Sequence, residues 1–163
     1  MRRALVITAS DGVDAGVRED TSGAGVGERL VALGFEVQRA VLPDVRETLA
    51  EVLRASAATH DLIVTTGGTG LTPRDVTPQA TRDVIDYEVP GLSEAMQAAG
   101  RAVTPLADLS RGVCGVVGRS LVINLPGSPK GALESLTAIE GVLDHALETL
   151  AGPFDHDARG SAE

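Results

Sequence analysis

Two loops rich in glycine and proline each follow an apolar segment of the sequence. One covers residues 65–70 (TTGGTG) and the other covers residues 124–129 (NLPGSP). Glycine lets backbone N–H groups approach an anion closely, and threonine hydroxyls add further donors. The second loop leads into a predicted helix, whose free N-terminal N–H groups and dipole favour a phosphate. We predict that the two loops together bind an oligophosphate. The alternative is that both are tight turns without a chemical role.

The first loop matches none of the common nucleotide-binding fingerprints. Gly70 is not followed by the Gly-Lys-Ser/Thr of a P-loop, and residues 67–70 lack the Gly-x-Gly-x-x-Gly pattern of dinucleotide folds. The sequence also has no Gly-x-Ser-x-Gly nucleophile elbow. We therefore expect a phosphate site of a different type.

Three aspartates follow the first three predicted strands: Asp11, Asp44 and Asp75. The carboxyl ends of parallel strands meet at one edge of a sheet, so these side chains are expected beside the loops. Carboxylates next to a phosphate site can hold Mg²⁺ through one or two contacts, because water and phosphate oxygens complete its coordination. Other interpretations stay open. Asp11 could be a turn residue, Asp44 a helix cap paired with Glu47, and Asp75 a solvated loop charge.

Basic residues near these loops could neutralise a bound phosphate. Arg74 and Arg111 could each bind phosphate through two hydrogen bonds. Lys130 lies at the start of the last predicted helix, where the helix dipole disfavours a cation unless an anion is bound. Cys114, the only cysteine, lies in an apolar segment and is predicted to be buried and unreactive. The three histidines are assigned no role.

Apolar, β-branched segments alternate with helical patterns in the first part of the chain. The predicted strands cover residues 3–9, 35–42 and 61–66. The predicted helices cover residues 21–33 and 44–60, and residues 11–20 are predicted to form a loop. Strands that alternate with helices imply right-handed crossovers and a parallel sheet with helices on both faces.

The second half of the chain adds a hairpin and three more helices. The predicted helices cover residues 77–85, 92–99 and 128–150, the first of them capped by Thr77. The hairpin pairs residues 113–117 with residues 121–124. The fold class is therefore α/β, with three layers (α/β/α) and a mostly parallel, mixed central sheet. Residues 1–152 are expected to form one domain and residues 153–163 a flexible acidic tail.

The composition excludes several classes of protein. The 23 acidic residues outnumber the 14 basic ones, and the formal net charge of −9 disfavours nucleic-acid binding, which needs a basic surface. No segment approaches the roughly 20 apolar residues of a membrane-spanning helix. The apolar run over residues 4–7 is too short for a signal peptide, so a cytoplasmic location is expected. A single cysteine excludes an internal disulfide, and scattered histidines argue against structural zinc.

The segment over residues 65–81, TTGGTGLTPRDVTPQAT, closely resembles the signature of the MogA/MoaB family of molybdenum-cofactor biosynthesis proteins. The corresponding domain of gephyrin belongs to the same superfamily. The resemblance spans residues 5–152. The other matching segments, in the same order along the chain, are Ser10-Asp11, Asp20 with Ser22-Gly23, Leu42-Pro43-Asp44, Glu88 with Pro90-Gly91, Leu109-Ser110-Arg111 and Asn124-Leu125-Pro126-Gly127-Ser128-Pro129.

This resemblance implies a molybdopterin-binding fold, usually trimeric, that adenylylates molybdopterin with MgATP. In that reaction the terminal phosphate of molybdopterin attacks the α-phosphate of ATP, and pyrophosphate leaves. Asp44 and Asp75 match the critical aspartates of the family and are expected to be catalytic and to hold Mg²⁺. Contacts with other proteins of molybdenum-cofactor biosynthesis are also expected. The residues expected to bind substrate are Ser10, Asp11, Thr66, Gly67, Gly68, Thr69, Gly70, Arg74, Glu88, Ser110, Arg111, Asn124, Pro126, Gly127, Ser128 and Pro129.

Two other functions fit the same resemblance. One is a non-catalytic molybdopterin-binding protein of the MoaB type. It is favoured by Gly12, which stands where many family members carry an arginine. The other is a domain that acts on a nucleotide metabolite, as in CinA-like proteins.

Overall fold

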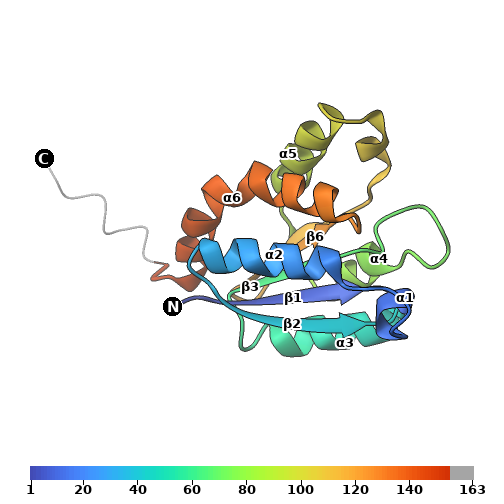
Figure 1. The fold of residues 1–163 in the computed structure, drawn as a ribbon. Coiled ribbons are helices and arrows are strands. Elements are labelled where there is room, and N and C mark those ends of the chain that lie inside the picture. The colour runs from blue at the N-terminus through green and yellow to red at the C-terminus, as the bar shows by residue number, and fades with distance from the viewer. Residues whose placement is uncertain (155–163) are drawn as a thin grey trace, which may run out of the picture.

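The computed structural model describes residues 1–154 and contains a six-stranded sheet between two layers of helices (Figure 1). The strands are β1 (Arg3–Ala9), β2 (Glu36–Leu42), β3 (Leu62–Thr66), β4 (Tyr87–Glu88), β5 (Cys114–Val117) and β6 (Ser120–Leu125). Their order across the sheet is β2-β1-β3-β6-β5-β4. The first four strands of that order are parallel, and β5 is antiparallel to both of its neighbours. This confirms the predicted fold class.

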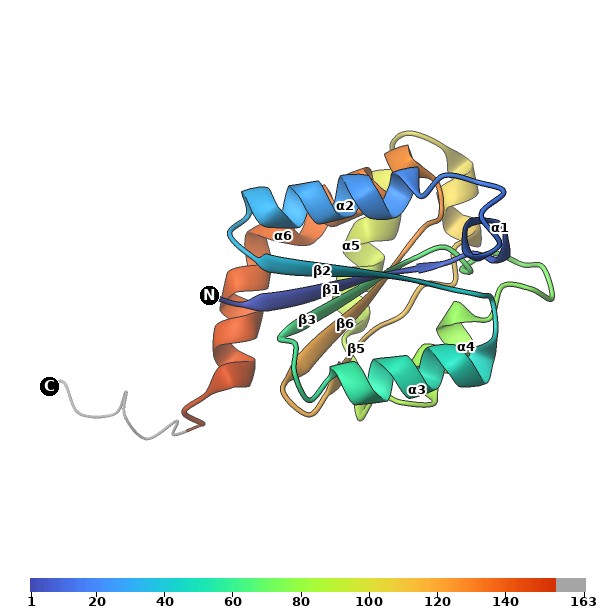
Figure 2. The same cartoon turned by 60° about the horizontal axis from the view of Figure 1, so that its bottom comes forward.

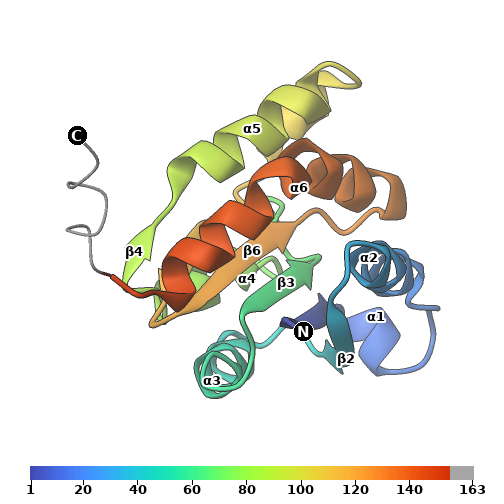
Figure 3. The same cartoon turned by 90° about the vertical axis from the view of Figure 1, so that its left-hand side faces the viewer.

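Helices cover both faces of the sheet. The helices are α1 (Asp11–Asp14), α2 (Thr21–Ala32), α3 (Arg46–Ser56), α4 (Thr77–Arg82), α5 (Pro90–Arg101), the 3₁₀ helix η1 (Pro105–Leu109) and α6 (Pro129–Ala151). Figures 2 and 3 show α2, α5 and α6 on one face, with α3 and α4 on the other. No helix among the described residues is long and apolar enough to cross a membrane.

The alternation of side chains along each parallel strand divides the core into two clusters. Ala4 and Val6 of β1 pack in the cluster under α2 and α6, which contains Leu30 and Leu136. Ile7, on the opposite face of the same strand, packs in the cluster under α3 and α4. Because helices cover both faces of the parallel strands, the side chains at odd and at even positions along each strand are both apolar. This is why the strands read as continuous apolar runs in the sequence.

The structure confirms the predicted hairpin as β5–β6 and the long last helix as α6, which Ser128 caps by accepting a hydrogen bond from the Gly131 N–H at 3.1 Å. Two short elements, β4 and η1, were not predicted, since elements of two and five residues leave no periodic pattern. Helix α5 is longer than the predicted 92–99 at both ends, because it begins at Pro90 and continues through Gly100 to Arg101.

Other boundaries were predicted wrongly. Residues 11–20 are not entirely loop, because α1 begins at Asp11 and is capped by the Ser10 hydroxyl. Helix α3 begins at Arg46 rather than residue 44 and ends at Ser56 rather than residue 60. Its N-cap is Val45, without a side-chain hydrogen bond, so the predicted capping box is absent. The reason is that the Asp44 carboxylate accepts a hydrogen bond from another loop.

Helix α4 also differs from the prediction at both ends, and it ends at Arg82 rather than residue 85. Thr77 is its first residue rather than its cap, and the N-cap is Val76, without a side-chain hydrogen bond. The predicted acidic tail covers residues 153–163, and its residues 155–163 lie outside the described part of the chain. The two tail residues within the described part are Pro153 and Phe154, and the ring of Phe154 lies 5.2 Å from the guanidinium of Arg119.

A buried amide joins β6 to its neighbours beneath the sheet edge. The side chain of Asn124 donates to the hydroxyls of Thr65 and Thr81, both at 3.0 Å, and accepts from the N–H of Val113 at 3.0 Å. Asn124 is 1% exposed. These three bonds fix β6 against β3, α4 and the segment entering β5, immediately below the loop that follows β6.

We expect Asn124→Ala to lower the free energy of unfolding by about 3 kcal/mol, because it leaves the Val113 N–H and two threonine hydroxyls without their buried partner. Urea unfolding followed by circular dichroism measures this change. Gln38→Ala is the matched control, since the Gln38 amide is exposed and its one side-chain hydrogen bond within residues 1–154 is to the His60 ring. Its effect should stay within about 0.5 kcal/mol. Equal effects of the two variants would contradict the structural role of Asn124.

Candidate functional site

A polar cavity of about 500 Å³ lies at the carboxyl ends of β1 and β3. Helices α2 and α6 begin at this same edge of the sheet (Figure 1). Nine of the predicted site residues line it: Ser10, Asp44, Thr66, Gly67, Gly68, Asp75, Gly127, Ser128 and Pro129. The structure thus brings together the two glycine loops and two of the three aspartates. Helix N-termini present unpaired N–H groups and partial positive charge, so this edge of the sheet suits an anion.

The glycines of the first loop are required by its geometry. Gly67 and Gly68 have positive φ angles of 91° and 68°, a region that other residues rarely adopt. A Cβ atom on Gly67 would lie 2.4 Å from the carbonyl oxygen of Ala9, and one on Gly68 would lie 2.2 Å from the Thr77 hydroxyl. A Cβ atom on Gly127 would lie 3.3 Å from the Cα of Gly67. The two loops therefore lie in close contact, as the phosphate-site prediction requires.

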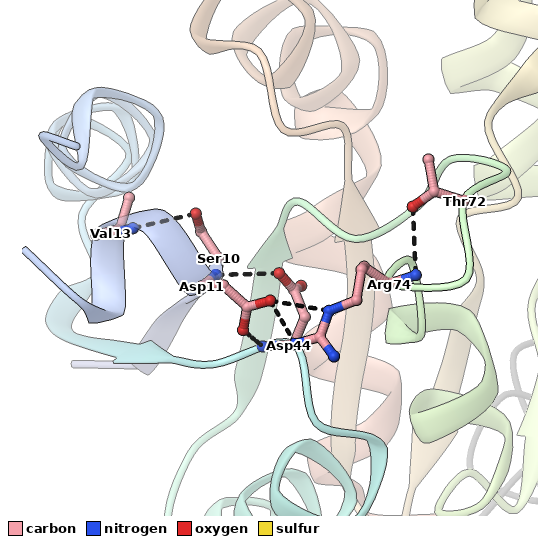
Figure 4. Close-up of polar contacts among 6 residues, drawn as sticks. All are labelled: Ser10, Asp11, Val13, Asp44, Thr72 and Arg74. Atoms are coloured by element: carbon pink, nitrogen blue, oxygen red, sulfur yellow. Dashed lines mark hydrogen bonds and ion pairs between the residues drawn. The ribbon is translucent and has the colours of Figure 1, made fainter. Parts of the chain in front are cut away.

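The carboxylates of Asp11 and Asp44 each accept a hydrogen bond from the backbone N–H of the other residue (Figure 4). The N–H of Asp11 donates to Asp44 Oδ2 at 3.0 Å, and the N–H of Asp44 donates to Asp11 Oδ1 at 2.9 Å. Arg74 forms an ion pair with Asp11, and its Nε donates to Asp11 Oδ2 at 3.0 Å. The loops after β1 and β2, which are adjacent strands, are thereby locked together. Asp11 does not line the cavity but supports Asp44, which does.

The two carboxylates of this pair differ in their electrostatic surroundings. The Arg74 guanidinium, together with the N–H of Asp44, lowers the pKa of Asp11. Burial raises the pKa of Asp44, and the neighbouring charges of Asp11 and Asp75 act in the same direction. Asp44 Oδ1 is buried and has no hydrogen-bond partner among the described residues. A carboxylate oxygen in this condition is ready to accept a cation or a donor from a ligand.

Asp75 lies on the other side of the first glycine loop and also lines the cavity. Its Oδ2 accepts hydrogen bonds from the N–H of Thr72 at 2.9 Å and from the Thr72 hydroxyl at 2.8 Å. A Cβ atom on Gly70 would lie 2.9 Å from that oxygen, so the loop passes close to the carboxylate. Asp75 is therefore oriented by its own turn rather than left as a solvated charge.

The donor set fits Mg²⁺ bound together with phosphate. The described residues contain no group of three or more His, Cys, Asp or Glu side chains that could hold a metal alone. Mg²⁺ in phosphoryl-transfer sites needs only one or two carboxylates, since phosphate oxygens and water supply its other ligands. Asp44 Oδ1, unpaired and buried, and Asp75 meet that requirement.

The first turn of α2 contributes residues that were not predicted as site residues. Asp20 caps the helix by accepting from the Gly23 N–H at 2.9 Å, and it also accepts from the Thr8 hydroxyl at 2.9 Å and from Arg39 at 2.7 Å. Although burial opposes the shift, these hydrogen bonds lower the pKa of Asp20. The hydroxyl of Ser22 is buried in the cavity wall without a partner among residues 1–154. These two residues could have been identified from the family resemblance, because Asp20 and Ser22-Gly23 match its sequence pattern.

The predicted phosphate-clamping arginines are engaged elsewhere. Arg111 donates to the carbonyl oxygens of Gly70 at 2.7 Å and Asp75 at 2.8 Å, so it shapes the first loop from outside the cavity. Arg74 is held by Asp11, as described above. Lys130 lies 3.8 Å from Glu134, with a largely exposed side chain, and does not line the polar cavity. Thr69, buried beneath the loop, accepts the Arg111 N–H at its carbonyl oxygen.

A second hollow of about 230 Å³ lies beside the polar cavity, between α5, η1 and the start of α6. Three further predicted residues line it, Ser110, Asn124 and Pro126, and it shares Ser128 with the polar cavity. Within the described part of the chain, its only charged lining residue is Glu134. A partly apolar hollow without a cationic side chain in its described lining suits a planar ring rather than a phosphate chain.

Two remaining side chains lie away from both hollows. Glu88 forms an ion pair with Arg82 at 3.0 Å, on the far side of β5, and is not brought to the other predicted residues. Cys114 is buried, and burial raises the pKa of its thiol to about 11. The prediction that Cys114 is buried is therefore confirmed.

Comparisons with known proteins agree with this geometry. Residues 5–145 match the family model described as a probable molybdopterin binding domain. The chain is 36% identical over 154 residues to the molybdopterin adenylyltransferase of Helicobacter pylori J99, an alignment that covers 91% of this chain and 88% of that one. It is 38% identical to the molybdenum cofactor synthesis protein cinnamon of Drosophila melanogaster over 89% of this chain. That alignment spans 25% of the longer protein.

Solved structures give the same result. The molybdopterin biosynthesis enzyme MoaB of Thermus thermophilus superimposes with a TM-score of 0.85 at 49% identity, covering 95% of this chain and 100% of that one. The Mog protein of Mycobacterium ulcerans gives 0.88 at 41% identity, with 92% and 99% covered. Sequence and fold therefore agree along nearly the whole chain, and the chain belongs to the MogA/MoaB family of molybdopterin-binding domain proteins.

Proposed function

We propose that this chain is a molybdopterin adenylyltransferase, which transfers the adenylyl group of MgATP to the terminal phosphate of molybdopterin. The observation that carries the proposal is Asp44 Oδ1, a buried and unpartnered carboxylate oxygen in a polar cavity where two glycine loops and two helix N-termini meet. Relatives that bear the name of this enzyme, and that align with nearly the full chain, support it.

Transfer of an adenylyl group requires positioning of the phosphates and neutralisation of their charge, and it does not require a protein nucleophile. An oxygen of the molybdopterin phosphate forms a bond to the α-phosphorus of ATP as the bond from that phosphorus to the β-bridging oxygen breaks, and pyrophosphate leaves with the electron pair. Asp44 and Asp75 would hold Mg²⁺, which when bound neutralises charge on the phosphates. Backbone N–H groups of the glycine loops and of the two helix N-termini would orient the phosphates for in-line attack.

The two adjacent hollows suggest how two phosphate-bearing substrates would meet. The polar cavity would hold the phosphates, and the second, partly apolar hollow would hold the ring of one substrate. Ser128, which caps α6 and lines both hollows, lies where they join. The reacting phosphates would therefore meet at the N-terminus of α6, which favours the negative charge that accumulates in the transition state.

Incubation of the purified protein with molybdopterin, ATP and Mg²⁺ should release pyrophosphate and form adenylylated molybdopterin. Asp44→Asn and Asp75→Asn should each lower kcat/KM by on the order of 100-fold or more, because each removes a charge from the site of phosphate transfer. Asp14→Asn, an exposed change in α1, is the matched control and should retain activity. Coupled pyrophosphate detection with chromatography of the pterin measures both products.

The same assay separates the enzyme from the non-catalytic alternative. A protein of the MoaB type without catalysis would bind molybdopterin but release no pyrophosphate above the level of a blank, and Asp75→Asn would leave its binding unchanged. That outcome, with a known adenylyltransferase active under the same conditions, would overturn the proposed activity.

The raised pKa of Asp44 leads to a second prediction. Because folding disfavours the ionised form, the Asp44 charge lowers stability at pH values above its folded pKa, and this cost disappears as the pH falls through that pKa. Asp44→Asn removes the charge while keeping an oxygen to accept the Asp11 N–H. Without ligands at pH 7, we therefore expect the variant to be at least as stable as the parent protein, and any gain should shrink at acidic pH. Urea unfolding at several pH values tests this, and a variant that is less stable at pH 7 would contradict it.

The oligomeric state and location stay predictions from the family resemblance. A homotrimer is expected, since a small domain gains buried surface by symmetric association. Light scattering coupled to size-exclusion chromatography should report three times the mass of the chain at micromolar concentration, whereas a monomer would contradict the prediction. A cytoplasmic location and contacts with other proteins of molybdenum-cofactor biosynthesis are proposed on the same basis.

A further inference from the structure

The lining of the polar cavity is unbalanced in charge for a site that binds a polyanion. Within the described residues it carries four carboxylate side chains, on Glu19, Asp20, Asp44 and Asp75, and a single cationic one, Arg18. Two of these carboxylates, Asp44 and Asp75, are the proposed Mg²⁺ ligands. Arg18 is not among the predicted site residues.

The guanidinium of Arg18 differs from those of the other arginines near the cavity, because it has no hydrogen-bond or ion-pair partner among the described residues. The Arg39 guanidinium pairs with Asp20 at 2.7 Å, Arg74 pairs with Asp11, and Arg111 donates to backbone carbonyl oxygens. Among residues 1–154, the Arg18 guanidinium has neither an ion pair nor a side-chain hydrogen bond, although it lines the cavity. It is the cation of this site that remains available to a ligand.

The position of Arg18 is set by the turn of chain that follows α1. Its N–H donates to the carbonyl oxygen of Gly12 at 3.1 Å. Its side chain lies on Gly12, because a Cβ atom at that position would be 3.6 Å from Arg18 Nε and 3.8 Å from Cζ. Those are ordinary contact distances, so the arginine packs against the face of α1 at Gly12, and a Cβ atom there would touch it without displacing it.

The wall beside Arg18 offers further groups for an anion. Thr21 and Ser22, in the first turn of α2, line the same cavity, and the Ser22 hydroxyl is buried at 7% exposure without a partner in the described part of the chain. The N-terminal field of α2 favours an anion because the charge of its cap, Asp20, is already balanced by Arg39. Arg18 and Glu19 both line the cavity and are both exposed, so solvent screens the charge of each.

We propose that Arg18, the Ser22 hydroxyl and the first turn of α2 form a phosphate-binding subsite, distinct from Asp44 and Asp75, that takes a phosphate group of the nucleotide or of the pyrophosphate product. The inference rests on the proposed function, which supplies a polyphosphate substrate. The guanidinium attracts the phosphate without a metal, so this subsite binds phosphate whether or not Mg²⁺ is present.

Isothermal titration calorimetry of the full chain with inorganic pyrophosphate, with and without Mg²⁺, tests the proposal. Arg18→Gln should weaken pyrophosphate binding about tenfold to 100-fold under both conditions, and Arg18→Lys should retain most of it. Ser22→Ala should weaken it less. Adenosine, which has no phosphate, should bind equally to all variants. Arg54→Gln, which removes the same charge from the far end of α3, is the matched control and should bind pyrophosphate as the parent protein does.

The outcomes are distinguishable from those of the activity assay, since no molybdopterin or turnover is involved. If the parent protein binds pyrophosphate and Arg18→Gln binds it equally well, the subsite is overturned while the proposed activity stands. If Arg54→Gln weakens binding as much as Arg18→Gln does, the effect is one of overall charge and the subsite is again overturned. If the parent protein binds neither pyrophosphate nor ATP, both proposals fail.

Discussion

The half-satisfied carboxylate of Asp44 is the constraint around which this edge of the molecule is arranged. One oxygen accepts the N–H of Asp11, and the other is buried in the cavity wall without a partner among the described residues. A buried, unpaired charge costs stability, and it persists only where the surrounding structure fixes its position. The reciprocal bond from Asp44 N–H to Asp11, and the ion pair of Asp11 with Arg74, supply that fixation. Asp44 therefore keeps one carboxylate oxygen available to a ligand, and its buried charge lowers the stability of the folded protein.

The sheet topology explains why these loops meet. From β1 the chain crosses to β2 on one side, and from β2 it crosses back over β1 to β3 on the other. The loops after β1 and β3 therefore diverge to opposite faces of the sheet, and the space between them is the crevice in which α/β proteins bind ligands. Thr8, Ala9, Thr66 and Gly67, at the ends of these two strands, line the cavity. The glycines of the first loop then let its backbone pass against β1 without a side chain between them.

Much of this could be predicted because it depends on local patterns. Continuous apolar runs identify parallel strands. The first glycine loop and Asp75 follow from their place after β3, and the second glycine loop follows from its place after β6. Asp44 was harder, because Asp44 and Glu47 also fit a capping box, and only tertiary structure decides that the carboxylate turns to Asp11 instead. Arg111 shows the same limit. Its position beside the loop was correctly expected, but the direction of a long side chain depends on the carbonyl groups that the folded loop offers.

The distribution of charge around the cavity also constrains how a polyphosphate binds. Asp44 and Asp75 repel a polyphosphate as long as no cation accompanies it, and Arg74 cannot relieve this because Asp11 already neutralises it. In a partly buried site this repulsion is screened less than at the surface. A polyphosphate that carries its own Mg²⁺ reverses the sign of the interaction, since the metal then approaches the unpaired oxygen of Asp44. We therefore expect a polyphosphate to bind this cavity more tightly with Mg²⁺ than without it, because only the metal offsets the repulsion by Asp44 and Asp75, and the weaker metal-free binding then rests on Arg18 and the first turn of α2.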